Sequence, residues 1–306
     1  MLVIYYNYTI FIKRGLILKL VLFFKTFEGN SKNYRLEKLK NSIIKWTGVI
    51  NLLKAIFIDI DGTLRINKRI DEKIIASLEQ LNNLGIKVII TTGRNFVHAR
   101  NLARKLKVYP LIIACNGALV KRYDNNEIIY DSKISRKTVR KIFDFTSSHN
   151  CKLVAHEDNN NYYIRKNDDI GTGIVGLTIT SNNYERMITM KYLFKDQIPE
   201  VEFVNSSKAI YLEKRIHNKI YFHDINNKNV TKGKGISEVL DYLNLNSNEV
   251  MSIGDSNNDI PMTYVVDKSI AVKDSTLALQ NNSTVTLTSD LGTYLSELVK
   301  KLQNNV

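Results

Sequence analysis

The sequence of 306 residues predicts an α/β fold, in which a parallel sheet is covered by helices and a second α/β domain is inserted. Two observations support this prediction. Short, β-branched, apolar segments alternate with amphipathic segments of helical period in residues 53–120, and the same alternation returns in residues 224–306. The intervening residues 121–223 have half-polar strand patterns instead, which indicates that they form a domain of their own.

The first part of the predicted core begins with a buried strand at 55–59, because a short β-branched and aromatic run is bounded there by a turn signal. A helix is expected at 71–84, where isoleucines and leucines recur on one face and Gly85 provides a C-terminal stop. The alternation is completed by a strand at 86–94, a helix at 95–106 and a strand at 111–115. Such strand–helix–strand units favour parallel pairing.

The inserted segment is expected to combine a helix at 136–148 with half-polar strands, of which "CKLVAH", "NYYIR" and "KAIYLE" are examples. The core pattern then resumes with a helix from Gly233 and closes with a helix from about residue 291. Between these two helices, strands are predicted at 249–253, 269–272 and 284–287.

Residues 1–52 form an N-terminal extension of a different character. Lys13, Arg14 and Lys19 divide its apolar stretch into pieces too short to span a membrane, so no integral membrane segment is expected. The stretch is also a poor signal peptide, because the apolar run precedes the charges. Three interpretations remain: a membrane-surface amphipathic segment, a helix docked on the body, or translated sequence upstream of the true start. We favour the third.

The basic charge is concentrated in the same region. Residues 1–54 hold ten Lys and Arg against two Glu, so +8 of the net charge of +14 lies there and +6 remains for the rest. The body is therefore only mildly basic, and it shows neither an RNA-binding aromatic signature nor a helix-turn-helix pattern. We expect no nucleic-acid partner, whereas a modest positive bias suits small anionic substrates.

The two cysteines, Cys115 and Cys151, lack the paired spacing of a disulfide framework or a thiolate metal site. They are therefore interpreted as reduced thiols in a reducing compartment, and a cytoplasmic protein is expected.

Polar clusters follow the predicted core strands at their carboxyl ends, which is where open parallel sheets place functional residues. Asp59 and Asp61 follow the first strand, "TGR" at 92–94 follows the second, and "GDSNND" at 254–259 follows the strand at 249–253. A further cluster, "TKGKG" at 231–235, opens a helix. Oxygen ligands without convergent His or Cys favour Mg²⁺, and magnesium beside lysine and glycine-rich backbone points to phosphoryl chemistry.

In this order, "DIDGTL", "TTGR", "TKG" and "GDSNND" resemble the motifs of the haloacid dehalogenase (HAD) superfamily. The long insertion between the second and third motifs is similar to that of the Cof-type phosphatase branch with a C2 cap. The resemblance runs from about Leu53 to the C-terminus. It implies a Rossmann-like, HAD-like core made of 53–120 and 224–306, with 121–223 as the α/β cap.

The resemblance also assigns roles to residues. Asp59 matches the nucleophile that becomes an aspartyl-phosphate, and Asp61 matches the general acid and base. Mg²⁺ would be held by Asp59, the Asp61 carbonyl and Asp255, with Asp259 supporting them. The expected phosphate-binding residues are Ile60, Thr92, Gly93, Lys232 and Asn258.

The function implied is that of a Mg²⁺-dependent phosphatase acting on small phosphorylated metabolites, such as sugar or cofactor phosphates. A phosphomutase of the same superfamily is the second interpretation, and a phospho-ligand-binding module is the third. The cap would choose the substrate, since the core binds only what all substrates share. Tyr162, Tyr163 and Arg165 are candidates for that contact.

Overall fold

The computed structural model describes residues 53–204, 210–212 and 219–304. These residues belong to one compact unit, Val49–Val306. The predicted extension, residues 1–52, lies outside the described residues.

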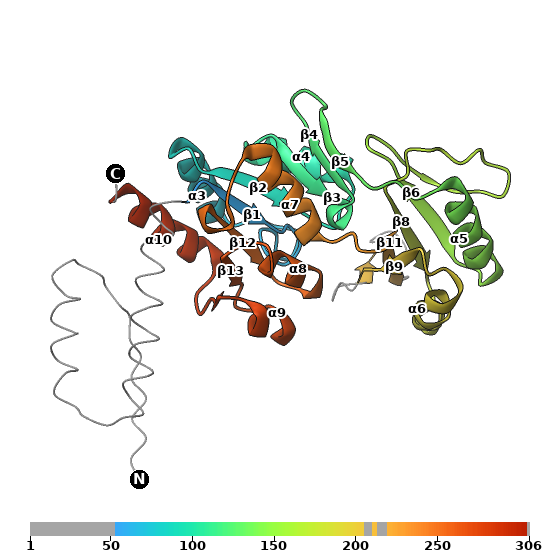
Figure 1. Ribbon diagram of the computed structural model, residues 1–306. Helices are drawn as coiled ribbons and strands as arrows, with labels where there is room; N and C mark the ends of the chain where they lie inside the picture. The colour runs from blue at the N-terminus through green and yellow to red at the C-terminus, as the bar shows by residue number, and fades with distance from the viewer. Residues whose placement is uncertain (1–52, 205–209, 213–218, 305–306) are drawn as a thin grey trace, which may run out of the picture. The chain divides into compact units, whose positions relative to one another are not determined.

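An eight-stranded sheet forms the core of this unit (Figure 1). Its central strand, β1 (Ala55–Ile58), pairs in parallel with β2 (Lys87–Thr91) on one side and with β12 (Val250–Gly254) on the other. The parallel arrangement continues through β3 (Leu111–Ala114), β13 (Lys268–Ala271) and β14 (Val285–Thr286). The predicted parallel α/β core is therefore confirmed.

Two antiparallel strands extend the same sheet beyond β3. They are β4 (Leu119–Arg122) and β5 (Ile128–Asp131), in the order β3-β4-β5. The connections on both sides of β4 are too short for the crossover that a parallel pair needs, so the chain can only fold back on itself. As a result, residues 121–131, which the sequence pattern assigned to the insertion, belong to the core sheet.

Helices cover both faces of the core sheet. On one face, Phe57 and Ile113 of the strands pack with Ile236 and Val239 of α7 and with Met262 of α8 in one apolar cluster. On the other face, α3 packs against α10, where the Ser77 and Ser296 hydroxyls are 3.1 Å apart. The helices of the core are α3 (Glu72–Asn83), α4 (Phe96–Leu106), α7 (Lys232–Leu243), α8 (Ile260–Thr263), α9 (Leu277–Asn282) and α10 (Leu291–Gln303).

The helix starts follow ordinary capping chemistry. Asp71, Asn95, Thr231 and Asp290 each precede a helix, and each side chain accepts a backbone N–H of the first turn. The cap at Thr231 fixes the first residue of α7, which is the predicted phosphate-binding lysine.

A second, antiparallel sheet forms the inserted part. Its strand order is β10-β11-β8-β6-β7, with β9 also pairing with β11. The strands are β6 (Lys152–His156), β7 (Asn161–Tyr163), β8 (Gly176–Ser181), β9 (Val201–Phe203), β10 (Ile210–Leu212) and β11 (Lys219–Asn227). Because β11 runs to Asn227, this sheet also reaches past the predicted limit at 223.

One face of the second sheet is covered by α5 (Arg136–Ser148) and α6 (Tyr184–Gln197), as Figure 1 shows. Leu153, Leu177 and Ile225 point to that side and share one apolar cluster with both helices. Residues alternate between the two faces of a strand, so His156, Thr178 and Asp224 lie on the opposite face. The 3₁₀ turn Cys115–Gly117 of the core lies against that face, where Asn226 Nδ2 donates to the Cys115 carbonyl oxygen at 2.9 Å.

None of the described helices is both long and apolar enough to cross a membrane.

Candidate active site

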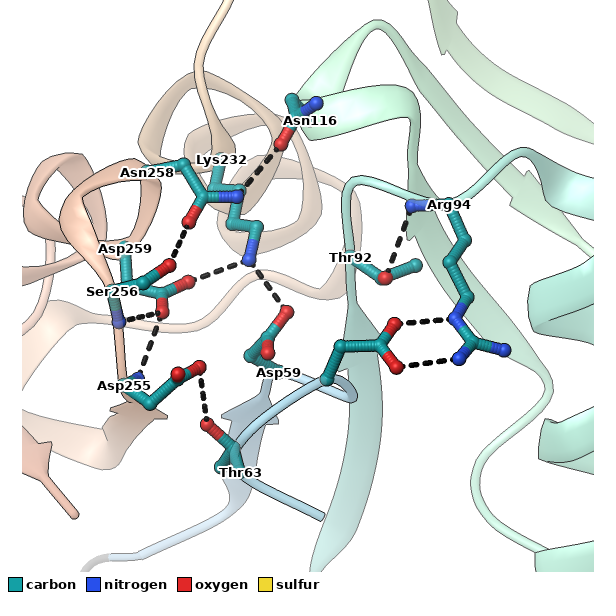
Figure 2. Close-up of polar contacts among 11 residues, drawn as sticks. Asp59, Thr63, Thr92, Arg94, Asn116, Lys232, Asp255, Ser256, Asn258 and Asp259 are labelled. Atoms are coloured by element: carbon teal, nitrogen blue, oxygen red, sulfur yellow. Dashed lines mark hydrogen bonds and ion pairs between the residues drawn. The ribbon is translucent and has the colours of Figure 1, made fainter. Parts of the chain in front are cut away.

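The predicted polar clusters meet at one edge of the core sheet, where the parallel strands β1, β2, β3 and β12 end. Asp59 directly follows β1, Thr92 follows β2, and Asp255 follows β12. Figure 2 shows their side chains converging with Lys232 from the start of α7. The register of neighbouring parallel strands thus brings together residues that are far apart in the sequence.

Three buried carboxylates and one buried ammonium group form the centre of the site. Oxygen atoms of Asp59, Asp255 and Asp259 all lie within 4.8 Å of one another. Lys232 Nζ donates to Asp59 Oδ1 at 2.6 Å and to Asp259 Oδ1 at 2.5 Å. The Lys232 side chain is only 1% exposed, which means that its charge is compensated by these carboxylates and not by water.

Burial governs the protonation of this cluster. It raises the pKa of Asp59 from 3.8 to about 8; Lys232 opposes the shift, while Asp259 and Asp255 add to it. Burial by itself lowers the pKa of Lys232, but the two neighbouring carboxylates outweigh it, so the net shift is upward. Asp59 and Asp259 thus share the ammonium group of Lys232.

This cluster of carboxylates matches what a divalent cation requires. The three oxygen ligands are hard donors, and they lie within 4.8 Å of one another. The residues present therefore fit a divalent metal ion.

Asp259 serves mainly to brace its neighbours. Its Oδ1 holds Lys232, and its Oδ2 accepts the backbone N–H groups of Asp255 and Ser256, both at 2.9 Å. Both oxygens are therefore engaged by the protein. On the other side of the cluster, Thr63 Oγ1 donates to Asp255 Oδ1 at 3.3 Å, so that bond ties the loop after β1 to the loop after β12.

Asp61 lies apart from the three-carboxylate cluster. Its carboxylate accepts two hydrogen bonds from Arg94, from Nε and Nη2, each at 2.5 Å. The Asp61 side chain is 50% exposed, so it can leave this pair by rotation at little cost in desolvation. Any metal contact through its backbone carbonyl stays a prediction.

The predicted phosphate-binding residues are also near one another. Thr92 is buried, and its hydroxyl accepts the backbone N–H of Arg94 at 3.1 Å. The Asn258 side chain donates to Asn116 at 3.0 Å and accepts from Ser256 at 2.6 Å (Figure 2). Ile60 is fully buried, directly after Asp59.

Asn116 is a site residue that the sequence analysis did not assign. It lies in a 3₁₀ turn, Cys115–Gly117, directly after β3, with a left-handed φ of 54°. Its side chain is buried and packs against Gly93, where a Cβ atom would be only 2.9 Å from Asn116 Oδ1. Glycine at 93 therefore permits the approach. The signal was available: this turn follows a parallel strand, at the same edge as the other polar clusters.

The turn at Asn116 also fixes the start of α7. Gly117 has a φ of 101°, and a Cβ there would lie 2.0 Å from the carbonyl oxygen of Thr231. Only glycine allows this contact, which presses the turn against the residue before Lys232.

Carboxylates, a buried lysine and side-chain amides lie together at the carboxyl edge of a parallel sheet. This arrangement is typical of α/β enzymes that act on a small ligand at that edge. The comparison with known families names the class. Residues 56–290 match the model of the haloacid dehalogenase-like hydrolases, and the chain belongs to this family. The resemblance found in the motifs is thereby confirmed, and the protein is a hydrolase of the phosphoric monoester type.

Similar proteins whose names state an activity belong to the same class of hydrolases. The phosphoglycolate phosphatase of Methanosarcina acetivorans is 26% identical over 253 residues, which cover 82% of this chain and 97% of that protein. A solved haloacid dehalogenase-like hydrolase from Bacteroides thetaiotaomicron has a TM-score of 0.69 at 16% identity, over 80% of this chain and 99% of that one. A sugar phosphatase of HAD subclass IIB has a TM-score of 0.64 at 22% identity, over 80% and 98% of the two chains. These structures share the fold.

Proposed function

We propose that this protein is a Mg²⁺-dependent phosphatase of small phosphorylated metabolites, such as sugar or cofactor phosphates, and that it works through an aspartyl-phosphate on Asp59. The observation that carries the proposal is the buried cluster of Asp59, Asp255, Asp259 and Lys232 at the carboxyl edge of the sheet. The phosphatase names of the relatives support the substrate class.

In the first step, an Asp59 oxygen attacks phosphorus, an Asp59 O–P bond forms and the ester P–O bond breaks. Lys232 already holds Asp59 Oδ1, which fixes the carboxylate and leaves the other oxygen to attack. Asp61, released from Arg94, gives a proton to the departing ester oxygen.

In the second step, Asp61 acts as a base instead of an acid. Asp61 takes a proton from water, the water oxygen bonds to phosphorus, and the Asp59 O–P bond breaks to release inorganic phosphate. The exposure of Asp61 supports this double role, because the side chain must meet both the leaving group and water.

Phosphate oxygens would be bound by Lys232, the Thr92 hydroxyl, the Asn258 amide, and the backbone at Ile60 and Gly93. The Asn258 amide has two N–H groups, so it would donate one to phosphate while the other stays on Asn116, which positions it. When bound, Mg²⁺ would offset the repulsion between a carboxylate and a phosphate dianion. The residues proposed to hold it are Asp59, Asp255 and the carbonyl of Asp61, with Asp259 behind them.

Sheet membership supports a revised division of the chain. We assign residues 53–131 and 228–304 to the catalytic core and 132–227 to the cap. The two cysteines, Cys115 and Cys151, are buried and unpaired with each other, which supports a location in the cytoplasm.

A phosphomutase would use the same residues and return the phosphoryl group to a bound substrate, and a binding module would hold phosphate without turnover. The experiment is to measure phosphate release from a panel of phosphorylated metabolites and one aryl phosphate, with Mg²⁺, by the wild type and by Asp59→Asn. Release that depends on Asp59 supports the phosphatase. Turnover only with an added sugar bisphosphate would support the mutase, and phosphate binding without release would support the module.

A further inference from the structure

The turn that carries Asn116 has a backbone conformation that needs support from its surroundings. Cys115, Asn116 and Gly117 follow one another with φ angles of 48°, 54° and 101°, so all three residues are left-handed. This region is unfavourable for residues that have a Cβ atom, as Cys115 and Asn116 do. Such conformations persist where the contacts around them hold the chain in place.

The core supplies part of this support. The backbone N–H of Cys115 donates to the carbonyl oxygen of Arg94 at 2.9 Å, and the N–H of Asn116 donates to that of Thr92 at 3.0 Å. Both bonds tie the turn to the loop that follows β2. This loop contains the predicted phosphate-binding residue Thr92, so the turn and the phosphate site are built together.

The proposed cap holds the same turn through Asn226, near the end of β11. The Asn226 side chain is buried, with the residue only 1% exposed. Its Nδ2 donates to the carbonyl oxygen of Cys115 at 2.9 Å and to that of Val175, directly before β8, at 3.3 Å. One amide group therefore bridges a carbonyl of the core turn and a carbonyl of the second sheet.

The turn in turn orients a predicted phosphate-binding amide. Asn258 Nδ2 donates to Asn116 Oδ1 at 3.0 Å, and Ser256 Oγ donates to Asn258 Oδ1 at 2.6 Å (Figure 2). The two bonds fix the direction of the Asn258 amide and leave its second N–H for a phosphate oxygen. A displaced turn would carry Asn116 Oδ1 with it and turn that N–H away.

We propose that Asn226 is a positioning residue of the phosphate site, which it supports from the cap by holding the turn that orients Asn258. The inference rests on the proposed phosphatase function and adds a second role for the cap, separate from the choice of substrate. Because the phosphate group is common to all substrates, loss of Asn226 should weaken every phosphate monoester by the same factor.

The test uses the full chain with Mg²⁺, an aryl phosphate as substrate and inorganic phosphate as inhibitor. Asn226→Ala should raise KM and the inhibition constant of phosphate by about fivefold each, the effect of one lost hydrogen bond. It should change kcat by less than about twofold, since the binding of phosphate weakens and the reacting groups stay in place. Loss of stability alone would reduce the amount of active enzyme, which lowers the apparent kcat and leaves KM unchanged. Asn226→Ser, which leaves a hydroxyl among the same carbonyls, takes its place if Asn226→Ala does not fold.

Asn227→Ala is the matched control. Asn227 is the next residue of β11, and its Nδ2 donates to Ser132 Oγ at 3.0 Å and to the carbonyl oxygen of Lys133 at 2.9 Å. It thus ties together the two connections between core and cap, but its bonds do not reach the turn. Asn227→Ala should leave KM and the inhibition constant within about twofold of the wild type, although it loses a similar pair of bonds.

A double variant separates positioning from general support. If Asn226 acts through Asn116, then adding Asn226→Ala to Asn116→Ala should not raise KM further. Two effects that multiply would overturn the inference. Equal increases of the inhibition constant in Asn226→Ala and Asn227→Ala, or none in either, would also overturn it.

The two proposals can fail separately. If the wild type releases phosphate from no ester, the phosphatase function is wrong. Calorimetry of inorganic phosphate binding with Mg²⁺ still decides the inference in that case, because Asn226→Ala should bind about fivefold more weakly than Asn227→Ala. Equal affinities of the two variants would refute it.

Discussion

Metal-free protein should lose stability between about pH 5 and pH 8, and Asp59 should account for much of the loss. Burial raises the pKa of this carboxyl group from 3.8 to about 8. A group whose pKa is raised on folding binds more protons in the folded than in the unfolded chain. The free energy of unfolding therefore falls as the pH rises through that window. This sign is opposite to that of a salt-bridged surface aspartate, which gains stability as the pH rises.

The size of the effect follows from the two pKa values. One pKa unit corresponds to about 1.4 kcal/mol. At pH 5 the unfolded side chain is already ionised while the folded one is protonated, so raising the pH to 8 should remove about 3 to 4 kcal/mol of stability. Asp59→Asn keeps the shape of the side chain and cannot titrate, so the variant should lack this part of the pH dependence.

The assay is urea unfolding at pH 5 and pH 8, followed by circular dichroism, for wild type and Asp59→Asn in the presence of a chelator. Groups that do not contact Asp59 titrate in both proteins and cancel in the difference. Equal pH dependence in the two proteins would refute the reasoning, because Asp59 would then ionise as easily in the folded protein as in the unfolded chain. Added Mg²⁺ should restore stability at pH 8 more in the wild type, since a bound cation favours the ionised carboxylates.

Further outcomes follow from the same site. Asp61→Asn should lower steady-state turnover by about 10²- to 10⁴-fold. The variant should still release a burst of about one aryl alcohol per enzyme from an aryl phosphate, since a good leaving group needs no proton. A linear time course without a burst would contradict the acid and base role. Chelation should abolish phosphate release, and Mg²⁺ should restore it. Ca²⁺ should support release poorly, because Ca²⁺ accepts more ligands in looser geometry. Full activity after exhaustive chelation would contradict the metal site. Asn116→Ala should raise KM for phosphate monoesters about tenfold, since Asn258 loses its partner; unchanged kinetics would show that this bond does not position Asn258.

Much of the core could be predicted because its signals are local. The strand before Asp59 is a short apolar run, and Thr231 caps the helix that carries Lys232 at its first position. Carboxyl ends of parallel strands share one edge, so the meeting of Asp59 with the loop at Asp255 also followed from the predicted sheet.

Other features depend on contacts between distant residues, and the pattern could not show them. β4 and β5 join the core sheet through short hairpins, although their composition resembles that of the insertion. The pairing of Asp61 with Arg94 spans 33 positions, and the contact of Asn116 with Asn258 spans 142. No periodicity encodes such distances. The domain limits and the assignment of Asn116 therefore needed the structure.

The central claim is that Asp59 carries the phosphoryl group, and the most direct measurement is to trap it there. Asp61→Asn should slow hydrolysis of the intermediate, so protein quenched in acid during turnover of an aryl phosphate should retain phosphate covalently. Mass spectrometry of the digested protein should then locate one phosphoryl group on Asp59, and the double variant that also carries Asp59→Asn should retain none. Phosphate on another residue, or active protein that never retains phosphate, would contradict the account.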